Sequence, residues 1–267
     1  MVHGGLAHLP SHEPPRHTSS VEALLRKMQR QGSVIILLGP PGAGKGTQAE
    51  RLSSALGIPN VSTGEILRQE CRSGSGLGLE VQRVLEAGQL VKDELMHEVV
   101  AQRLKQPDCA QGCILDGFPR TAAQARFLDR LLAGSAFRAP IVLDLAIEPQ
   151  ILIERLSSRR QCPACSRTYH MRPGASEYCP HDETQLIIRN DDRPATIRRR
   201  LEIYAANTSD IVRFYQNRGY HRVDASQPVE KLTQKLLAIL GGAESETATS
   251  SDFARPVVAA STARLYA

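Results

Sequence analysis

A glycine-rich segment, from Gly39 to Thr47, carries residue types suited to holding a phosphate. It reads G-P-P-G-A-G-K-G-T and follows the apolar run 34–38 directly. Its glycines allow backbone N–H groups to converge on an anion, where a Cβ would crowd the ligand or forbid the turn. Lys45 adds a mobile positive charge, and a helix that begins near Gly44 would add its positive end. The sequence therefore predicts a phosphate-binding loop, whereas a ligand-free strand-to-helix turn is the plainer alternative.

The residue after the lysine departs from the usual pattern of such loops, G-x-x-x-x-G-K-[ST]. Gly46 stands where the hydroxyl residue is expected, and Thr47 follows one position later. A direct bond from Thr47 to Mg²⁺ is therefore in doubt. Asp116 ends a second apolar run, 112–116, and the carboxyl ends of parallel strands are where ligands gather. This carboxylate could order Mg²⁺ directly or through water, or it could simply cap a helix.

A second cluster combines three cysteines and a carboxylate. Cys162 and Cys165 have the C-x₂-C spacing of a metal knuckle, and Cys179 and Asp182 repeat it as C-x₂-D. Three thiolates and one carboxylate oxygen would close a tetrahedral site with no open position, which is typical of structural zinc. Ordinary loop cysteines without metal are the alternative. Two histidines are rival fourth ligands, His170 and His181.

Seven arginines recur beside glycine turns or at helix ends: Arg68, Arg120, Arg155, Arg159, Arg167, Arg189 and Arg200. Taken singly, each is more typical of a solvated surface charge. Together with a phosphate loop they indicate a cage for a polyanion. We find no histidine or aspartate in the usual setting of a kinase general base. A phosphate acceptor needs none, because its attacking oxygen is already ionised, so charge neutralisation and alignment would suffice.

The elements that must position these residues alternate between strands and helices. Apolar runs predict strands at 34–38, 112–116, 141–147 and 220–224. Helical patterns lie between them, at 47–56, around Arg68, and at 77–87, 93–106, 121–132, 149–160, 195–216 and 228–240. This alternation predicts crossover units and a parallel sheet. Residues 1–31 predict disorder with one short helix at 21–30, and the tail 243–267 predicts disorder.

Composition limits the class of protein without deciding it. The chain has 267 residues, 41% hydrophobic and 4% aromatic, with a formal net charge of +5 and a pI of about 9.0. This size suits one domain with insertions, and the basic balance suggests anionic partners. No apolar run reaches membrane-spanning length, and the first residues lack the apolar core of a secretory signal. The cytoplasm is the expected location, with an organelle transit peptide as the alternative.

Six motifs spread from about Ser33 to Leu240 resemble the adenylate kinase family. They read G-P-P-G-A-G-K-G-T-Q, S-T-G-E-I-L-R, D-G-F-P-R-T-A-A-Q-A, R-R-Q-C-P-A-C-S-R-T-Y-H, R-N-D-D-R-P-A-T-I-R-R-R-L and V-D-A-S-Q-P. The resemblance implies a P-loop α/β fold with a five-stranded parallel sheet flanked by helices, and the reaction Mg·ATP + AMP ⇌ 2 ADP. It implies a core (32–62, 92–155 and 193–242), an AMP-binding helical insert (63–91) and a zinc-knuckle lid (156–192) of the bacterial type. The protein would be a monomer that binds ATP, AMP and ADP, and neither nucleic acid nor membrane.

The resemblance also implies a role for individual residues. ATP would be bound by Gly42, Ala43, Gly44, Lys45, Gly46, Thr47, Arg155, Arg159, Thr168, Tyr169 and Gln227. AMP would be bound by Thr63, Arg68, Leu90, Val91, Gly117, Arg120, Gln124, Arg189 and Arg200. The catalytic set would be Lys45, Arg120, Arg155, Arg159, Arg189, Asp191, Asp192 and Arg200. Asp116 and Thr47 would order Mg²⁺, the Cys162, Cys165, Cys179 and Asp182 set would hold Zn²⁺, and Arg167 would pair with Asp191 and Asp192.

One residue departs from the family pattern. Glu65 replaces the more usual Asp after S-T-G, which could retune the AMP pocket. Three other functions stay open at this stage: a kinase for UMP or CMP, a zinc-ribbon protein that binds nucleic acid, and an inactive regulator with the same fold. The sequence lacks the interleaved aromatic residues that stack on bases, which argues against a protein that binds nucleic acid.

Overall fold

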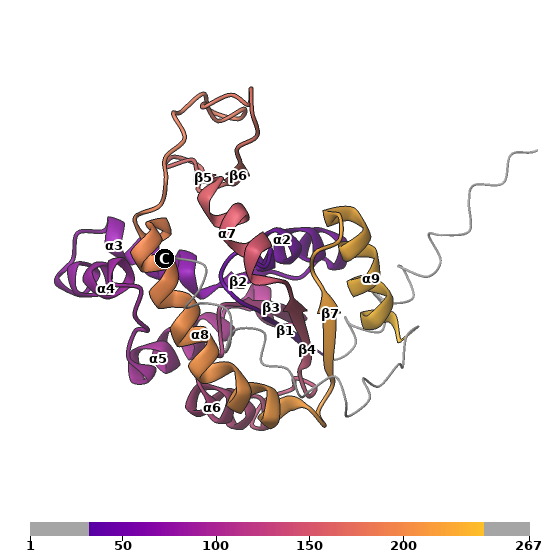
Figure 1. Cartoon of the computed structure of the whole chain (residues 1–267). Coiled ribbons are helices and arrows are strands. Elements are labelled where there is room, and N and C mark those ends of the chain that lie inside the picture. Colours follow the sequence, from indigo (N-terminus) through magenta and orange to yellow (C-terminus); the bar gives the residue numbers. More distant parts are fainter. Residues whose placement is uncertain (1–31, 243–267) are drawn as a thin grey trace, which may run out of the picture.

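The computed structural model describes residues 32–242, and the expected disorder at 1–31 and 243–267 and the short helix at 21–30 lie outside the described residues (Figure 1). Five parallel strands form the central sheet in the order β2-β3-β1-β4-β7. The strands are β1 Ser33–Leu38, β2 Asn60–Ser62, β3 Gly112–Asp116, β4 Ile141–Ala146 and β7 Tyr220–Asp224. The predicted five-stranded parallel sheet is therefore confirmed. The three-residue strand β2 was not predicted, because it is too short to show a pattern of its own.

Strand β1 lies at the centre of the sheet and is buried on both faces. Ile35 and Leu37 face one hydrophobic layer, whereas Val34 and Ile36 face the other. This alternation follows from the period of two in a strand. Complete burial of each such side chain contributes about 1.5–3 kcal/mol, so the residues before the phosphate loop hold it firmly in place.

Helices cover both faces of the sheet (Figure 1). The layer on one face is built from α2 Lys45–Leu56, α7 Pro149–Ser157 and α9 Val229–Gly241. The layer on the other face is built from α5 Asp93–Leu104, α6 Ala122–Ala133 and the second half of α8 Pro194–Tyr215. A short 3₁₀ helix, η1 Pro107–Cys109, precedes β3. No helix of the described part is long and apolar enough to cross a membrane.

Two appendages project from this body (Figure 1). One is the helix pair α3 Thr63–Arg72 and α4 Gly76–Glu86. The other is a segment with the antiparallel pair β5 Arg159–Gln161 and β6 Thr168–His170, which returns through the 3₁₀ turn η2 Asn190–Asp192. They coincide with the stretches expected to be the AMP-binding insert and the lid, although the functional division itself stays a prediction.

The helix predicted at 149–160 is wrong at its end. Helix α7 stops at Ser157, and Arg159 opens strand β5. The hydroxyls of Ser157 and Ser158 bond back to the carbonyls of Glu154 and Arg155, at 3.0 and 3.2 Å. Serine hydroxyls compete in this way with the continuing helical hydrogen bonds, which favours termination.

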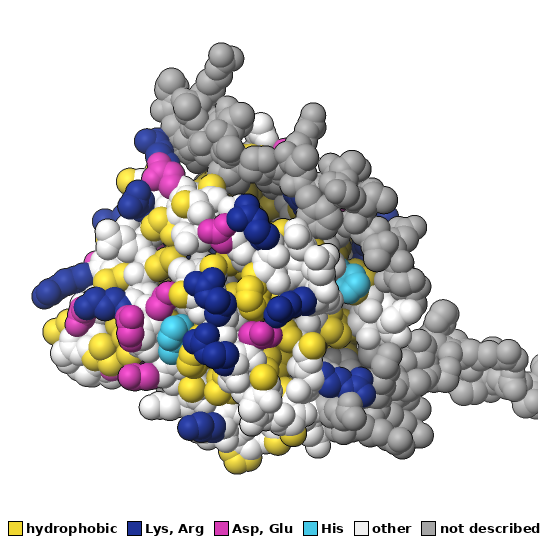
Figure 2. Space-filling model, turned by 90° about the horizontal axis from the view of Figure 1, so that it is seen from below, with side chains coloured by type: hydrophobic (Ala, Val, Ile, Leu, Met, Phe, Trp, Pro, Cys, Tyr) yellow, Lys and Arg dark blue, Asp and Glu magenta, His cyan; other side chains and the backbone are white. Residues whose placement is uncertain are grey.

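The face of the molecule that lies below in Figure 1 carries many basic side chains, yet they do not form one patch. Figure 2 shows Lys and Arg on this face interspersed with Asp, Glu and apolar side chains. Exposed arginines of the described part have acidic partners, for example Arg218 with Asp129 at 3.1 Å and Arg213 with Asp210 at 3.3 Å. Mixed charge of this kind is ordinary for a protein surface, and the described residues visible in this view give no continuous basic track for a polyanion.

Candidate active site and metal centre

A cleft of about 500 Å³ opens beside the carboxyl end of the sheet. Its walls come from the phosphate loop, the segment after β3, helix α3, the β5–β6 segment and helix α8. This is the edge of the sheet where the residues that follow each parallel strand meet. The volume is in the range of small-molecule sites, so the cleft is the candidate active site.

The phosphate loop has the predicted geometry. Gly44 has a φ of 95°, which a residue with a Cβ rarely adopts, and it caps the N-terminus of α2. The Nζ of Lys45 donates to the carbonyls of Gly39 and Pro40, at 2.7 and 2.9 Å. Burial lowers the pKa of Lys45 to about 8, with a contribution from nearby cations that include Arg120, while Asp116 opposes them. A negatively charged ligand would stabilise the charged form of Lys45 and raise its pKa again.

Asp116 faces the loop from the neighbouring strand. The register pairs Asp116 with Leu37, so the carboxylate lies level with the end of β1. A Cβ built at Gly46 would lie 3.6 Å from Asp116 Oδ2. This distance is an ordinary contact, so it places position 46 beside the carboxylate without excluding a side chain there. The carboxylate and the displaced Thr47 both line the cleft.

Gly117 lets two other cleft residues come together. The Thr63 hydroxyl donates to the Asp116 carbonyl at 3.3 Å, and Arg120 Nε donates to the Gly117 carbonyl at 2.8 Å. Gly117 has a φ of 87°, and a Cβ there would lie 2.8 Å from Thr63 Oγ1 and 2.9 Å from Arg120 Nη2. A side chain at this position would push both groups apart.

Glu65 braces an arginine of the cleft. Its carboxylate accepts from Arg68 Nε at 3.0 Å and from Arg72 Nη2 at 2.9 Å. Partial burial raises the pKa of Glu65, but hydrogen bonds from Arg72, Arg68 and Ser166 outweigh it, so the pKa lies below its ordinary value. The Glu65 carboxylate thus contacts two guanidinium groups of α3, and Ser166 belongs to the projecting segment.

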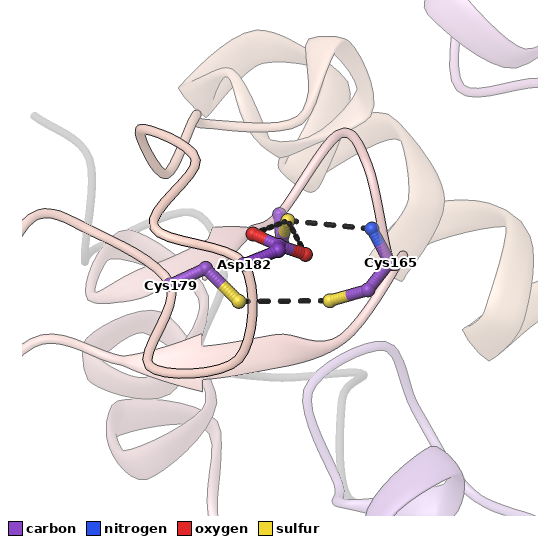
Figure 3. A group of neighbouring side chains, drawn as sticks. Cys165, Cys179 and Asp182 are labelled. Carbon is purple, nitrogen blue, oxygen red and sulfur yellow. Dashed lines mark hydrogen bonds between the residues drawn. The ribbon is translucent and has the colours of Figure 1, made fainter.

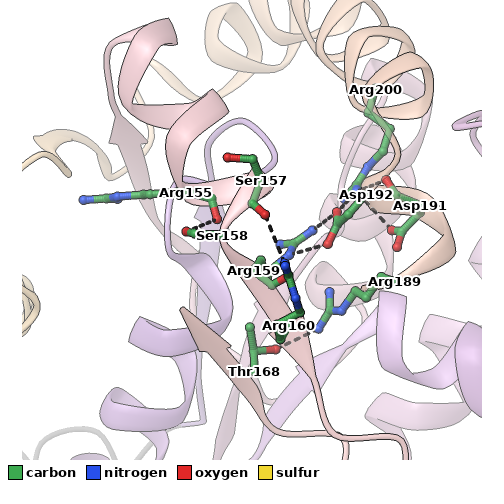
Figure 4. Close-up of polar contacts among 10 residues, drawn as sticks. All are labelled: Arg155, Ser157, Ser158, Arg159, Arg160, Thr168, Arg189, Asp191, Asp192 and Arg200. Carbon is green, nitrogen blue, oxygen red and sulfur yellow. Dashed lines mark hydrogen bonds and ion pairs between the residues drawn. The ribbon is translucent and has the colours of Figure 1, made fainter. Parts of the chain in front are cut away.

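Two carboxylates organise the arginines between the projecting segment and α8 (Figure 4). The Arg159 guanidinium forms a two-point ion pair with buried Asp192, in which Nε lies 2.7 Å from Oδ2. Arg200 Nη1 lies 3.0 Å from Asp191 Oδ2 and 3.2 Å from Asp192 Oδ1. The resemblance implied that these acids position arginines, and the structure pairs them with Arg159 and Arg200.

The implied pairing of Arg167 with Asp191 and Asp192 is wrong. Arg167 Nη1 contacts His181 Nε2 instead, and its charge acts on Glu50 of helix α2. Arg167 precedes β6, whereas the two acids lie in η2 beside Arg159 and Arg200. The closer arginines therefore occupy the carboxylates.

Positive charge exceeds negative charge in the cleft. Burial and neighbouring arginines lower the pKa of Arg120 and of Arg189 to about 10. Arg189 Nη2 donates to Thr168 Oγ1 at 2.8 Å, while its buried Nε has no partner among the described residues. Guanidinium groups crowded in this way are suited to bind several phosphate oxygens.

Most of the expected nucleotide-binding residues line the cleft, but four residues of the expected site do not: Ala43, Tyr169, Asp192 and Gln227. Ala43 is buried in the core, and Tyr169 directs its hydroxyl to Cys179 Sγ at 3.2 Å. Gln227 donates to the Asp224 carbonyl at 3.1 Å. Asp192 acts behind the cleft surface through its ion pairs. The roles of these residues stay predictions.

Sequence reasoning missed part of the cleft wall. Apolar residues from α5 and α8 line it, namely Met96, Ile203 and Ile211. Their helical spacing alone reads as ordinary core packing, because wall and core residues share the same apolar pattern. Asp93 was also missed: it sits in the first turn of α5, where an acidic residue is expected for helix stability alone.

Three cysteines and Asp182 converge at the projecting segment (Figure 3). Cys162 Sγ lies 3.3 Å from both Asp182 oxygens, and Cys165 Sγ lies 3.6 Å from Cys179 Sγ. Tetrahedral zinc bonds of ordinary length would place two sulfurs about 3.8 Å apart, and sulfur and oxygen about 3.5 Å apart. The donor set therefore fits such an ion. His181 is engaged with Arg167, so of the rival ligands it is Asp182 that joins the cysteines.

The two appendages are also linked at their bases. Asn190 Nδ2 donates to Glu86 Oε1 at 3.0 Å, and the Thr196 hydroxyl donates to the Glu86 carbonyl at 3.1 Å. Glu86 ends helix α4, whereas Asn190 lies in η2 and Thr196 in the first turn of α8. The cleft is thus bounded by segments that contact each other directly.

A phosphate loop after the central strand, facing a crowded set of arginines, defines a P-loop α/β protein that handles phosphate-bearing ligands. Comparison with known proteins narrows this class. Residues 37–220 match the adenylate kinase family model, and the chain belongs to the adenylate kinase family. It is 45% identical over 189 residues to an adenylate kinase of Anaeromyxobacter sp. (strain Fw109-5), which covers 70% of this chain and 88% of that protein. It is 41% identical to those of Kosmotoga olearia (76% of this chain, 96% of that protein) and Moorella thermoacetica (78% and 97%).

Proposed function

We propose that the protein transfers a phosphoryl group reversibly from Mg·ATP to AMP and so forms two ADP. The observation that carries this proposal is the arrangement of the cleft: Lys45 of the phosphate loop and Arg120 of the segment after β3 line the same cleft, where the charge of Arg120 helps to lower the pKa of Lys45. Two cationic sites that share one cleft suit two phosphate-bearing ligands. The curated relatives carry the name of this activity.

On the donor side, the backbone of the phosphate loop and Lys45 would hold the ATP phosphates. Asp116 and Thr47 would hold Mg²⁺ and its waters, since both line the cleft beside Gly46. Bound magnesium neutralises charge on the phosphates. Arg155 extends from helix α7 and donates to the Ala225 carbonyl at 3.1 Å, which fixes it beside the loop near Gly44.

On the acceptor side, Thr63, Arg68 and Arg120 would bind the AMP phosphate, and Gln124 would contact its base. Arg159, Arg189 and Arg200 also line the cleft and would neutralise the group in transfer. The acceptor oxygen is ionised near neutral pH, so these residues need to align and shield it rather than remove a proton. Exclusion of water from the closed cleft would prevent hydrolysis of the donor.

The projecting segment would act as a lid stapled by Zn²⁺ at Cys162, Cys165, Cys179 and Asp182. All six cysteines of the chain are free, and the four donor atoms lie within 4.8 Å of one another. A monomer in the reducing cytoplasm, with neither nucleic acid nor membrane as partner, remains part of the proposal. Free cysteines are the ordinary state in that compartment.

The test is ADP formation from ATP with each of AMP, CMP, UMP and GMP, on protein in which zinc is quantified. We expect AMP to be the preferred acceptor and about one zinc per chain. Preference for UMP or CMP would replace the proposed acceptor. Nucleic-acid binding that weakens steeply with salt, without ADP formation, would reject the whole proposal.

A further inference from the structure

Gln124 is held at three points in the first turn of α6, and its residue is only 2% exposed. Its backbone N–H donates to Thr121 Oγ1 at 3.1 Å. Its side-chain oxygen accepts from the Arg120 backbone N–H at 2.7 Å. Its side-chain nitrogen donates to Asp93 Oδ1, also at 2.7 Å. The Gln124 amide therefore has a partner at each end.

These partners fix which end of the amide is which. A carboxylate only accepts hydrogen bonds and a backbone N–H only donates them, so neither Asp93 nor the Arg120 N–H can exchange its role. A reversed Gln124 amide would place its oxygen against the Asp93 carboxylate and its N–H₂ against the Arg120 N–H. Both contacts would then be repulsive, and two buried polar groups would lose their bonds.

The pinned amide leaves one N–H and one oxygen lone pair unused. Gln124 lines the cleft, whereas Asp93 does not. A donor beside an acceptor matches the edge of a 6-aminopurine, which offers a ring-nitrogen acceptor next to an amino donor. A 6-oxopurine in the same position offers the reverse, an N–H beside a carbonyl oxygen. The fixed amide thus favours one base chemistry over the other.

We infer that Asp93 is a specificity-determining positioning residue, which selects a 6-aminopurine acceptor by holding the Gln124 amide in one orientation. This inference rests on the proposed function. Asp93 itself is held, because the Thr121 hydroxyl donates to its second oxygen, Oδ2, at 3.0 Å. Thr121 in turn caps the helix that carries Gln124, so the three residues form one closed hydrogen-bonded unit.

The test is Asp93→Asn, compared with wild type in steady-state transfer from ATP to AMP and to inosine monophosphate. An asparagine offers one oxygen to the two donors that Asp93 serves, and its N–H₂ can donate to a reversed Gln124. We expect the ratio of kcat/KM for AMP to that for inosine monophosphate to fall at least about tenfold. The KM for ATP stays unchanged, because the phosphate loop is not touched.

Asp108→Asn is the matched control. It removes an aspartate near the other end of α5, which pairs with Arg103 at 2.7 Å and has no contact with Gln124. Its acceptor ratio stays at the wild-type value. Asp93→Ser serves as a second variant if the asparagine protein folds poorly, since a serine is too short to hold the Gln124 amide and loses the same preference.

Several outcomes overturn the inference. An Asp93→Asn or Asp93→Ser protein that keeps the wild-type acceptor ratio removes the orienting role. Equal losses with both acceptors, accompanied by a lower melting temperature, make Asp93 a purely structural residue. Wild-type protein that forms no ADP from ATP and AMP rejects the proposed function instead, before any variant is compared.

Discussion

The phosphate loop and the projecting β5–β6 segment border the same cleft, yet different forces hold them. The loop follows β1, in which all six residues are buried between two helix layers. The projecting segment has a core of three buried residues, Cys162, Cys179 and Leu186. Such a small core cannot hold a chain segment by burial alone, so the ion pairs of the segment and, under the proposed function, a metal ion at its donor cluster would add the missing stability.

The difference separates a phosphate loop whose geometry is fixed by the sheet from a projecting segment that has little core of its own. A cradle of backbone N–H groups works only if its geometry does not change, and the sheet supplies that constancy. Under the proposed function the β5–β6 segment would cover the bound ligands and would have to admit and release them, so lower local stability would suit it. The proposed function would thus assign ligand capture and ligand enclosure to regions of different stability, and four predictions test this contrast.

The largest effect is expected at Lys45. Replacing it with alanine removes the charge that the loop directs at phosphate, so kcat/KM should fall about 10²–10³-fold. Stability should not fall, because burial already disfavours the charged lysine and lowers its pKa to about 8. Paired kinetics and thermal melts measure both. Arg51→Ala is the control, because Arg51 lies on the same helix and, among the described residues, pairs with exposed Glu230. A loss of melting temperature equal to that of a core mutation would contradict the prediction.

The second effect is expected at the joint between the two regions. Asp192 has a fully buried carboxylate that serves both Arg159 and Arg200. Asp192→Asn leaves these arginines without their shared counter-charge, which should cost about 3 kcal/mol in the free energy of unfolding. Urea denaturation measures the cost. Asp191→Asn is the matched control, since that carboxylate is partly exposed and pairs with Arg200; equal costs for both variants would show that burial of Asp192 is irrelevant.

Removal of metal should loosen one region and spare the other. Chelation, or Cys179→Ser, should raise amide hydrogen exchange at least about tenfold across 159–192, while strands β1 and β3 keep their protection. Activity at saturating nucleotide should fall less than the protection does, since the phosphate loop is intact. Cys71→Ser, outside the donor cluster, is the control. Unchanged amide exchange after chelation would show that a metal ion does not stabilise this segment.

The smallest effect is expected in the core beneath the loop. Burial raises the pKa of Asp144, although the Tyr220 hydroxyl donates to it at 2.6 Å, and its Oδ1 has no partner among the described residues. A raised folded-state pKa means that the contribution of Asp144 is complete below the ordinary aspartate pKa and is lost as the pH rises above it. Asp144→Asn should therefore gain about 1 kcal/mol over wild type at pH 8 and nothing at pH 4. Melts at both values measure this gain, exposed Asp129→Asn is the control, and a pH-independent difference would refute it.

Local patterns in the sequence predicted the parts of the site that are local in the chain. The phosphate loop, the strands at 112–116 and 220–224 and the four metal donors each lie within a short stretch whose spacing carries the signal. The parallel sheet followed from alternation of strands with helices, because that order allows few other folds.

Contacts between distant segments could not be predicted in this way. Asp93 and Gln124 are 31 residues apart, and nothing in either stretch shows that they meet. Arg167 was assigned to the wrong partners because sequence order does not reveal which of several arginines comes closest to a carboxylate. The end of α7 was misplaced because the helical pattern continues past Ser157, while the serine hydroxyls and the pairing of β5 with β6 decide otherwise.

A single residue, Ser158, separates helix α7 from strand β5. Arg155 lies before it and is tied to the body of the protein through the Ala225 carbonyl. Arg159 lies after it and is tied to Asp192 (Figure 4). Two arginines only four positions apart are thus mounted on different parts of the molecule. If the β5–β6 segment turns about Ser158, the distance between the two guanidinium groups changes. A polyphosphate of fixed length would then contact both arginines at only one position of the segment. The length of the polyphosphate would therefore determine the position in which the site is closed.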